Sequence, residues 1–147
     1  MSDVQAAART VGLQTYVQNA SSSREIDAAF ANFVQQRVNA LTFAADAILA
    51  RQHDQIIALA ARHALPTIYF VREFVHAGGL MSYGASITDK YRQIGIYTGR
   101  VLKGAKPSEL PVMQPTKYEF VINLKTAETL GLDIPAKLLA LADKVIE

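Results

Sequence analysis

The chain contains no cysteine among its 147 residues. Disulfide bridges, zinc sites built on thiolates and a cysteine nucleophile are therefore excluded together. It also contains no run of five or more like charges, because its 15 basic and 13 acidic residues are scattered along the whole length. Binding to a phosphate backbone at physiological salt needs a concentrated basic face. The charge pattern thus argues against a nucleic-acid partner and favours a mixed, solvated surface.

Long apolar runs are missing as well. No segment approaches the roughly 20 apolar residues that a helix needs to span a bilayer. The opening residues, MSDVQAAART, carry an acidic side chain and several polar ones but no apolar core, so they lack the pattern of a secretory signal. From these two absences we expect a chain that is neither embedded in a membrane nor addressed for export.

The signatures of common enzyme classes are also absent. The sequence has no GxSxG elbow, no phosphate-binding P-loop and no GxGxxG run. Two of the three histidines, His53 and His63, lie ten residues apart, which is the wrong spacing for one helix face to present both to a metal. We therefore expect no catalysis, no bound metal and no cofactor. A small α/β enzyme stays the weakest alternative, because it needs a clustered acid–base pair that the sequence does not show.

Strand-like and helical patterns alternate along the chain. Half of the residues are hydrophobic and 19% are charged, which is enough to bury a sizeable core in one ordinary domain. Short apolar or alternating runs separate segments of helical periodicity, and these strand-like runs are 13–20, 40–45, 67–71, 80–84 and 118–123. The alternation predicts an α/β fold with a mostly parallel, doubly wound, Rossmann-like sheet and helices on both faces.

Several of the predicted helices carry their own start signals. Ser22 and Glu25 have the spacing of a capping box ahead of an apolar stripe, and Ser86 and Asp89 repeat that spacing. Residues 134–147 have the pattern of a single terminal amphipathic helix. Helix starts also offer free backbone N–H groups to an anion, so each serine is open to two interpretations, a cap alone or part of a binding site.

The beginning of the chain is irregular for this fold class. A doubly wound domain normally begins with a strand, whereas residues 2–12 have a helical pattern that ends in glycine. A missing first strand leaves an open sheet edge or a gap, which something must cover, such as a second copy of the chain. Further along, three prolines within residues 105–115 predict a linker or crossing segment that is neither helix nor central strand.

Ligands of open parallel sheets bind beyond the carboxyl ends of the strands. In this chain the predicted strand ends are followed by polar or aromatic residues, at 19–22, 44–46, 72–73 and 83–89. These four segments are the candidate binding edge.

The chain resembles a known family along nearly its whole length. The run from Gly78 to Glu147, and within it LKGAKPSELPVMQPTKYEFVINLKTAETLGL, is similar to the C-terminal part of tryptophan-binding-like solute-binding proteins of ABC transporters. The segments NASSSREIDAAFANFVQQRVNALTF and ALAARHALPTIYFVREF resemble the middle portion of that family in the same order. The resemblance implies a type I periplasmic-binding-protein fold, in which two Rossmann-like lobes joined by crossing strands close on a small organic solute and deliver it to a membrane permease.

Against that pattern, the first lobe and the opening strand of the second lobe are absent. The resemblance therefore predicts a second-lobe α/β domain over 1–86, and a crossing segment, a final strand and C-terminal helices over 87–147. The chain is expected to be a C-terminal fragment of the substrate-binding component of an ABC importer. Its solute would be a small organic molecule, such as an amino acid. The alternative is a self-associating remnant, a swapped homodimer that covers the missing lobe and binds no solute. The family resemblance implies the periplasm, whereas a chain without an export signal is expected to stay in the cytoplasm.

The resemblance also implies roles for individual residues. An arginine at position 72 would pair with a solute carboxylate, a tyrosine at position 83 would stack on an aromatic solute, and Asp89 would meet an ammonium group. The full set of expected ligand-binding residues is Asn19, Ser21, Ala45, Asp46, Arg72, Glu73, Tyr83, Gly84 and Asp89. Half a cleft encloses too little of a ligand for tight binding, so we expect weak binding or none unless an oligomer supplies the second wall.

Overall fold

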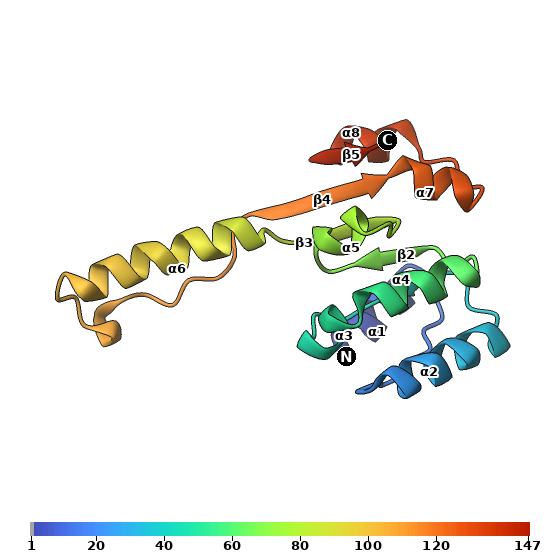
Figure 1. The fold of residues 1–147 in the computed structure, drawn as a ribbon, viewed down its shortest axis with the longest axis horizontal. Helices are drawn as coiled ribbons and strands as arrows, with labels where there is room; N and C mark the ends of the chain where they lie inside the picture. Colours follow the sequence, from blue (N-terminus) through green and yellow to red (C-terminus); the bar gives the residue numbers. More distant parts are fainter. Residues whose placement is uncertain (1) are drawn as a thin grey trace.

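The computed structural model describes residues 2–147 and consists of a body and a projecting arm (Figure 1). The body is built on a five-stranded sheet in the order β1-β2-β3-β4-β5. The strands are β1 (Leu41–Thr42), β2 (Thr67–Tyr69), β3 (Met81–Ala85), β4 (Tyr118–Asn123) and β5 (Lys144–Ile146). All neighbouring strands are parallel except β3 and β4. The predicted α/β fold with a mostly parallel sheet is therefore confirmed.

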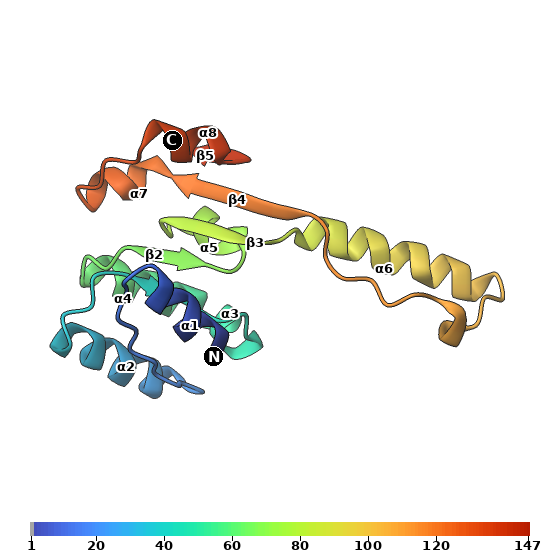
Figure 2. The same cartoon turned by 180° about the vertical axis from the view of Figure 1, so that it is seen from behind.

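Helices lie on both faces of this sheet. The helices are α1 (Ser2–Thr10), α2 (Ser23–Gln35), α3 (Ala47–Arg51), α4 (His53–Arg62), α5 (Arg72–His76), α6 (Ile87–Leu102), α7 (Leu124–Thr129) and α8 (Ala136–Leu141). A 3-10 turn, η1 (Pro107–Glu109), follows α6. The views from opposite sides show α4 and α5 on one face, and α1 and α8 on the other (Figures 1 and 2). No helix within residues 2–147 combines the length and the hydropathy that a membrane crossing requires.

The apolar core lies where α2, α4 and α5 pack against β1 and β2. It is formed by Ile26, Phe30, Leu41, Ile56, Ala60, Leu65, Tyr69 and Phe74. Of the apolar stripe predicted for the first capped helix, Ile26, Ala29 and Phe30 are buried on one face of α2 and Phe33 is partly buried, whereas Val34 is exposed. The rings of Tyr69 and Phe74 stack with centroids 4.6 Å apart, which joins the strand to α5.

The arm consists of α6 and the chain that returns beside it to β4. It extends away from the body as a helix and an irregular strap (Figure 1). The Tyr97 hydroxyl donates a hydrogen bond of 2.8 Å to the carbonyl of Pro111, which ties the returning chain to the helix. No residue of α6 is buried. The predicted boundary between residues 86 and 87 falls at the start of this helix, and the division into two domains there stays a prediction.

Two secondary-structure predictions are wrong. Residues 13–20 alternate like a strand, but they are in no strand, because β1 is the edge of the sheet and pairs only with β2. The C-terminal residues do not form one helix: α8 ends at Leu141 and β5 follows. Asp143 causes this change, since its backbone N–H donates to the Phe120 carbonyl and its carboxylate accepts from the Phe120 N–H, each at 2.8 Å. The chain is thereby held beside β4.

Candidate functional site

Most of the predicted site residues lie where the strands end, at the base of the arm, and this end of the sheet is the binding edge. The carboxyl ends of β1, β2 and β3 meet there because these strands are parallel. Strand β4 runs antiparallel to β3, so its first residues reach the same edge, with Glu119 opposite Gly84. This edge is where both chain segments of the arm join the body (Figure 2).

A polar cluster ties three segments together at this edge. One guanidinium nitrogen of Arg72 lies 3.3 Å from a carboxylate oxygen of Glu119, and another donates to the Thr88 hydroxyl at 3.0 Å. The buried Ser86 hydroxyl donates to the other oxygen of Glu119 at 2.7 Å. We call Arg72, Ser86, Thr88 and Glu119 the arm-base cluster. It joins the start of α5 to the outgoing and the returning segments of the arm.

Ser86 has a second role as the cap of α6. Its side-chain oxygen accepts a hydrogen bond from the Asp89 N–H at 3.3 Å, as the sequence spacing predicts. Its own N–H donates to the carbonyl of Lys117 on the returning segment at 2.9 Å. The buried Ser86 therefore both caps α6 and ties it to the returning segment. These contacts fix the direction in which α6 leaves the body.

Arg72 is the cation that a solute carboxylate would meet, and it is already partnered. Besides Glu119, the carboxylate of Glu73 lies 3.7 Å from its Nε atom. About a third of the Arg72 side chain is exposed, so one side of the guanidinium is accessible from solvent. Arg72 and Glu73 also line a shallow hollow together with His76 and Lys144. An incoming carboxylate would share the guanidinium with Glu119 or displace it.

Aromatic rings form a platform on the opposite face of the same two strands. Tyr83 and Tyr118 stack with centroids 5.7 Å apart, and Phe120 meets Tyr83 edge-on at 6.4 Å. Tyr83 is 58% exposed, so the platform is open to solvent. Side chains alternate along a strand, so Tyr83 points away from the face that holds Gly84 and Glu119. Tyr83 and Arg72 are therefore close in the fold but on different faces of the sheet.

Gly84 occupies a position that a side chain cannot enter. A Cβ atom built there would lie 1.8 Å from the carbonyl oxygen of Phe70, which follows β2. The backbones of the two strand ends approach closely because this residue is glycine. The predicted site residue Gly84 thus sets the spacing of the binding edge.

Two other predicted residues make contacts within or next to their own helices. The Asp46 carboxylate caps α3, accepting from the N–H groups of Ile48 and Leu49 at 2.7 and 3.1 Å. Asp89 accepts two hydrogen bonds from Arg92, at 2.7 and 3.0 Å. These contacts match the purely structural interpretation, in which polar residues at helix starts act as caps and surface pairs and bind no ligand.

The segment before α2 holds the remaining polar candidates. The N–H and the hydroxyl of Ser21 donate to the Glu25 carboxylate at 2.7 and 2.8 Å. These two bonds, the backbone bond first, hold the pKa of Glu25 below its usual value. Ser22 accepts from the Glu25 N–H, so the capping box is shared between two serines. Asn19 and Ala45 are exposed and have no such structural role.

Sequence analysis missed Glu119, Thr88 and Tyr118. One signal was available for Glu119, because a carboxylate inside an otherwise apolar strand must find a partner when it is shielded from water. Its partner Arg72 is 47 residues away, so no local pattern identifies the pair. Within the described residues, no three histidine, aspartate or glutamate side chains are grouped so that they could hold a metal ion.

A family model described as ABC transporter substrate binding protein matches residues 1–146. The chain belongs to this family. The match extends over nearly the whole sequence, so it covers the body, the arm and the binding edge alike. The family consists of binding proteins and is typically non-enzymatic. None of the curated proteins compared with the chain matches it.

Solved structures agree with this assignment. The chain is 28% identical to an ABC domain from Streptococcus pneumoniae in complex with L-Trp, with a TM-score of 0.88 over 99% of this chain and 50% of that one. A conserved domain protein from Vibrio cholerae has the same fold, at 23% identity and a TM-score of 0.89, with coverage of 99% and 49%. The open, ligand-free substrate-binding protein CD0873 from Clostridium difficile matches at 18% identity and a TM-score of 0.66, with coverage of 99% and 48%. The chain thus spans about half the length of these proteins.

Proposed function

We propose that this chain forms one wall of a solute-binding cleft and acts as the second-lobe, C-terminal part of the binding component of an ABC importer. The family match over residues 1–146 carries the proposal. In this function the chain binds a small organic solute without transforming it, in the periplasm, and presents it to a membrane permease. The division of the chain at residues 86 and 87 belongs to the same proposal.

Amino acids are the solute class that we propose. The relative from Streptococcus pneumoniae is described in complex with L-Trp, and the binding edge offers groups suited to each part of such a molecule. Arg72 provides a cation for the carboxylate and Asp89 an anion for the ammonium group, and Tyr83, on the opposite face of the sheet, offers a ring to an aromatic side chain that reaches past the strand ends. The backbone and side chains at the other strand ends would complete this wall, and they are Asn19, Ser21, Ala45, Asp46, Glu73 and Gly84.

One wall alone encloses little of a solute. Good small-molecule sites bury roughly 70 to 90% of the ligand surface, and the aromatic platform and Arg72 both face solvent in this chain. We therefore expect dissociation constants in the millimolar range for the isolated chain, where about 4 kcal/mol of binding free energy is available. A second wall would raise the affinity.

The second candidate function is a self-associating remnant. The unburied arm favours it, because a homodimer would give α6 the apolar cover that it lacks. In this interpretation the chain forms a swapped homodimer and binds no solute.

Solute binding can be tested by two-dimensional NMR on the isolated chain with L-Trp added to several millimolar. We expect shift changes at the strand ends 44–46, 72–73 and 83–89. Tyr83→Ala should abolish them, whereas Tyr91→Ala, which removes another exposed ring, from the arm, should leave them unchanged. Shift changes confined to the arm, or none with any amino acid, would refute the proposal. If light scattering shows a dimer and no solute changes its stability, the chain is the self-associating homodimer instead.

A further inference from the structure

The guanidinium of Arg72 lies between two carboxylates of the chain. Glu119 is 3.3 Å from one of its terminal nitrogens, and Glu73 is 3.7 Å from its Nε atom. The other terminal nitrogen donates to the Thr88 hydroxyl at 3.0 Å. A guanidinium has five N–H donors, so these three contacts leave donors for a solute carboxylate. A carboxylate that binds Arg72 therefore arrives next to an anion of the protein.

The two carboxylates differ in how firmly they are held. The side chain of Glu73 is 54% exposed, whereas that of Glu119 is 17% exposed. Glu119 is fixed by the β3–β4 ladder, where it lies opposite Gly84, and its second oxygen accepts from the buried Ser86 hydroxyl at 2.7 Å. A shielded, hydrogen-bonded charge interacts more strongly than one that moves freely in water. Glu119 is thus the preorganised anion beside Arg72.

Glu119 keeps the capacity to bind another donor. A carboxylate accepts about four hydrogen bonds, and Arg72 and Ser86 supply one each. Part of the Glu119 side chain reaches solvent, and 37% of the Arg72 side chain does so at the same edge. The pair therefore presents a cation and an anion side by side, with hydrogen-bonding capacity left on both.

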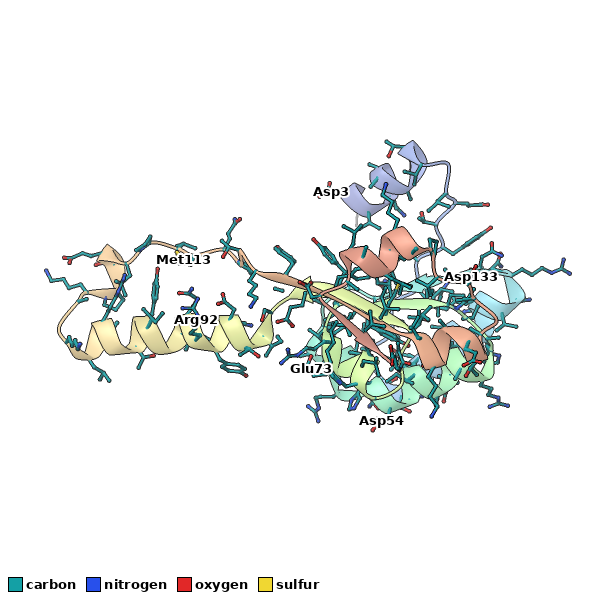
Figure 3. The ribbon with its side chains drawn as sticks, turned by 90° about the horizontal axis from the view of Figure 1, so that it is seen from above. Asp3, Asp54, Glu73, Arg92, Met113 and Asp133 are labelled. Carbon is teal, nitrogen blue, oxygen red and sulfur yellow. The ribbon has the colours of Figure 1, made fainter. Side chains whose placement is uncertain are left out.

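An α-amino acid carries the matching pair of charges. Its carboxylate and its ammonium group are bonded to the same carbon atom, so their protein partners must also be adjacent. Arg72 and Glu119 are in direct contact, which satisfies this condition. Figure 3 shows Glu73, the neighbour of Arg72 in sequence, where the arm joins the body.

Asp89 is the other anion available to the ammonium group. It accepts two hydrogen bonds from Arg92, at 2.7 and 3.0 Å, and Arg92 lies out along α6 (Figure 3). An ammonium group donates three hydrogen bonds, so it needs more than one acceptor. Glu119 therefore adds to Asp89 and is the acceptor in contact with Arg72.

We propose that Glu119 is a specificity-determining residue of the binding edge, where its carboxylate binds the ammonium group of a solute whose own carboxylate is on Arg72. The ion pair thereby selects zwitterions over solutes that carry only one of the two charges. A solute with the carboxylate alone meets the negative charge of Glu119, and a solute with the ammonium group alone meets the positive charge of Arg72. The inference rests on the proposed function, because it requires that the solute binds at this edge.

Three indole compounds that differ in their charged groups test this selection. L-Trp has both groups, tryptamine lacks the carboxylate, and indole-3-propionate lacks the ammonium group. Each is titrated into the chain and followed by two-dimensional NMR at residues 72–73 and 83–89. We expect L-Trp to bind about tenfold more tightly than either analogue, since a hydrogen bond to a charged group contributes about that factor. In Glu119→Gln, which keeps an acceptor for Ser86, the preference for L-Trp over indole-3-propionate should fall by about tenfold.

A matched variant and a second signal accompany this measurement. Glu109→Gln removes an equal charge from another ion pair, formed with Lys106 at 3.7 Å on the arm, and should leave the preference unchanged. In the unsubstituted chain, the carboxyl carbon signal of Glu119 should shift more with L-Trp than with indole-3-propionate at saturation. This signal tests the assignment without any substitution, so the test stands even if Glu119→Gln unfolds.

The outcomes separate the inference from the proposed function. Equal affinity for the three compounds, or a preference that Glu119→Gln leaves intact, would overturn the role of Glu119 while solute binding at the edge stands. Equal weakening of all three by the substitution would also overturn it, because a residue that only supports the arm shows no dependence on ligand charge. No response of the strand ends to any of the three compounds would refute the proposed function and the inference with it.

Discussion

Replacing Gly84 with alanine should destabilise the body strongly, because the added methyl group has no space. Its Cβ would lie 1.8 Å from the oxygen and 2.8 Å from the carbon of the Phe70 carbonyl. The contact is with backbone, so no side chain can rotate away, and the strand ends must separate by more than about 1 Å to relieve it. Overpacking of this kind costs about 1 to 3 kcal/mol when neighbours can adjust. We expect at least about 3 kcal/mol here, a large share of the 5 to 15 kcal/mol that holds a typical domain.

The matched control is Gly95→Ala. Gly95 is in the middle of α6 and its added Cβ would meet no atom within 4 Å, so the substitution should stabilise the helix by about 0.5 to 1 kcal/mol. Urea unfolding followed by circular dichroism measures both variants against the unsubstituted chain. If Gly84→Ala unfolds within about 1 kcal/mol of the parent, the close approach of β3 to Phe70 is not a feature of the folded protein.

Three further predictions concern single side chains. Ser86→Ala removes both the α6 cap and a donor to Glu119, so it should lower the free energy of unfolding by about 1 to 3 kcal/mol in urea titrations; an unchanged midpoint would contradict the tethering role. Burial raises the pKa of Tyr69 to about 12. Stability present below pH 10 should therefore decline by up to about 3 kcal/mol as pH rises towards 12. The ultraviolet phenolate signal, compared with that of Tyr69→Phe, measures the ionisation. Ser21→Ala should move the lowered pKa of Glu25 part of the way towards its usual value, because the hydroxyl bond is lost while the larger effect, the bond from the backbone N–H of residue 21, remains. Stability gained from that lowered pKa is lost as pH falls through it, so the stability of the variant should depend less on acid. NMR titration of Glu25 measures the change in its pKa, and an unmoved titration would refute the assignment.

Local chemistry explains which parts of the fold were predictable. The caps of α2 and α6 involve residues three positions apart, so Ser22 and Ser86 could be identified from spacing alone. The buried strands were likewise visible as apolar runs, although β1 and β2 are shorter than predicted. These signals need no knowledge of distant residues.

The failures all depend on distant partners. A strand forms only beside another strand, so the alternation in residues 13–20 produces none where no strand of the described sheet lies beside it. The end of α8 is decided by hydrogen bonds between Asp143 and Phe120, which lie 23 residues apart. The antiparallel pair of β3 and β4 follows from the arm, which carries the chain out and back at the same sheet edge. Periodicity predicted a helix for the C-terminus because a local sequence pattern contains no information about these contacts.

The candidate site shows the same division. Strand ends indicate an edge, and Arg72, Gly84 and Tyr83 do lie along it. Which face each residue occupies, and which side chain it meets, depends on register across the sheet. The pairing of Arg72 with Glu119 therefore appears only once the strands are assembled.

The arm leaves the body in one direction although no residue of α6 is buried, so packing of its apolar side chains cannot set that direction. What remains is the β3–β4 ladder and the arm-base cluster, in which Ser86 and Glu119 bond at 2.7 Å and Arg72 reaches both arm segments. Polar contacts contribute modest net stability, about 1 kcal/mol each, but they define geometry closely. The direction of the arm is therefore set by the polar contacts at its base.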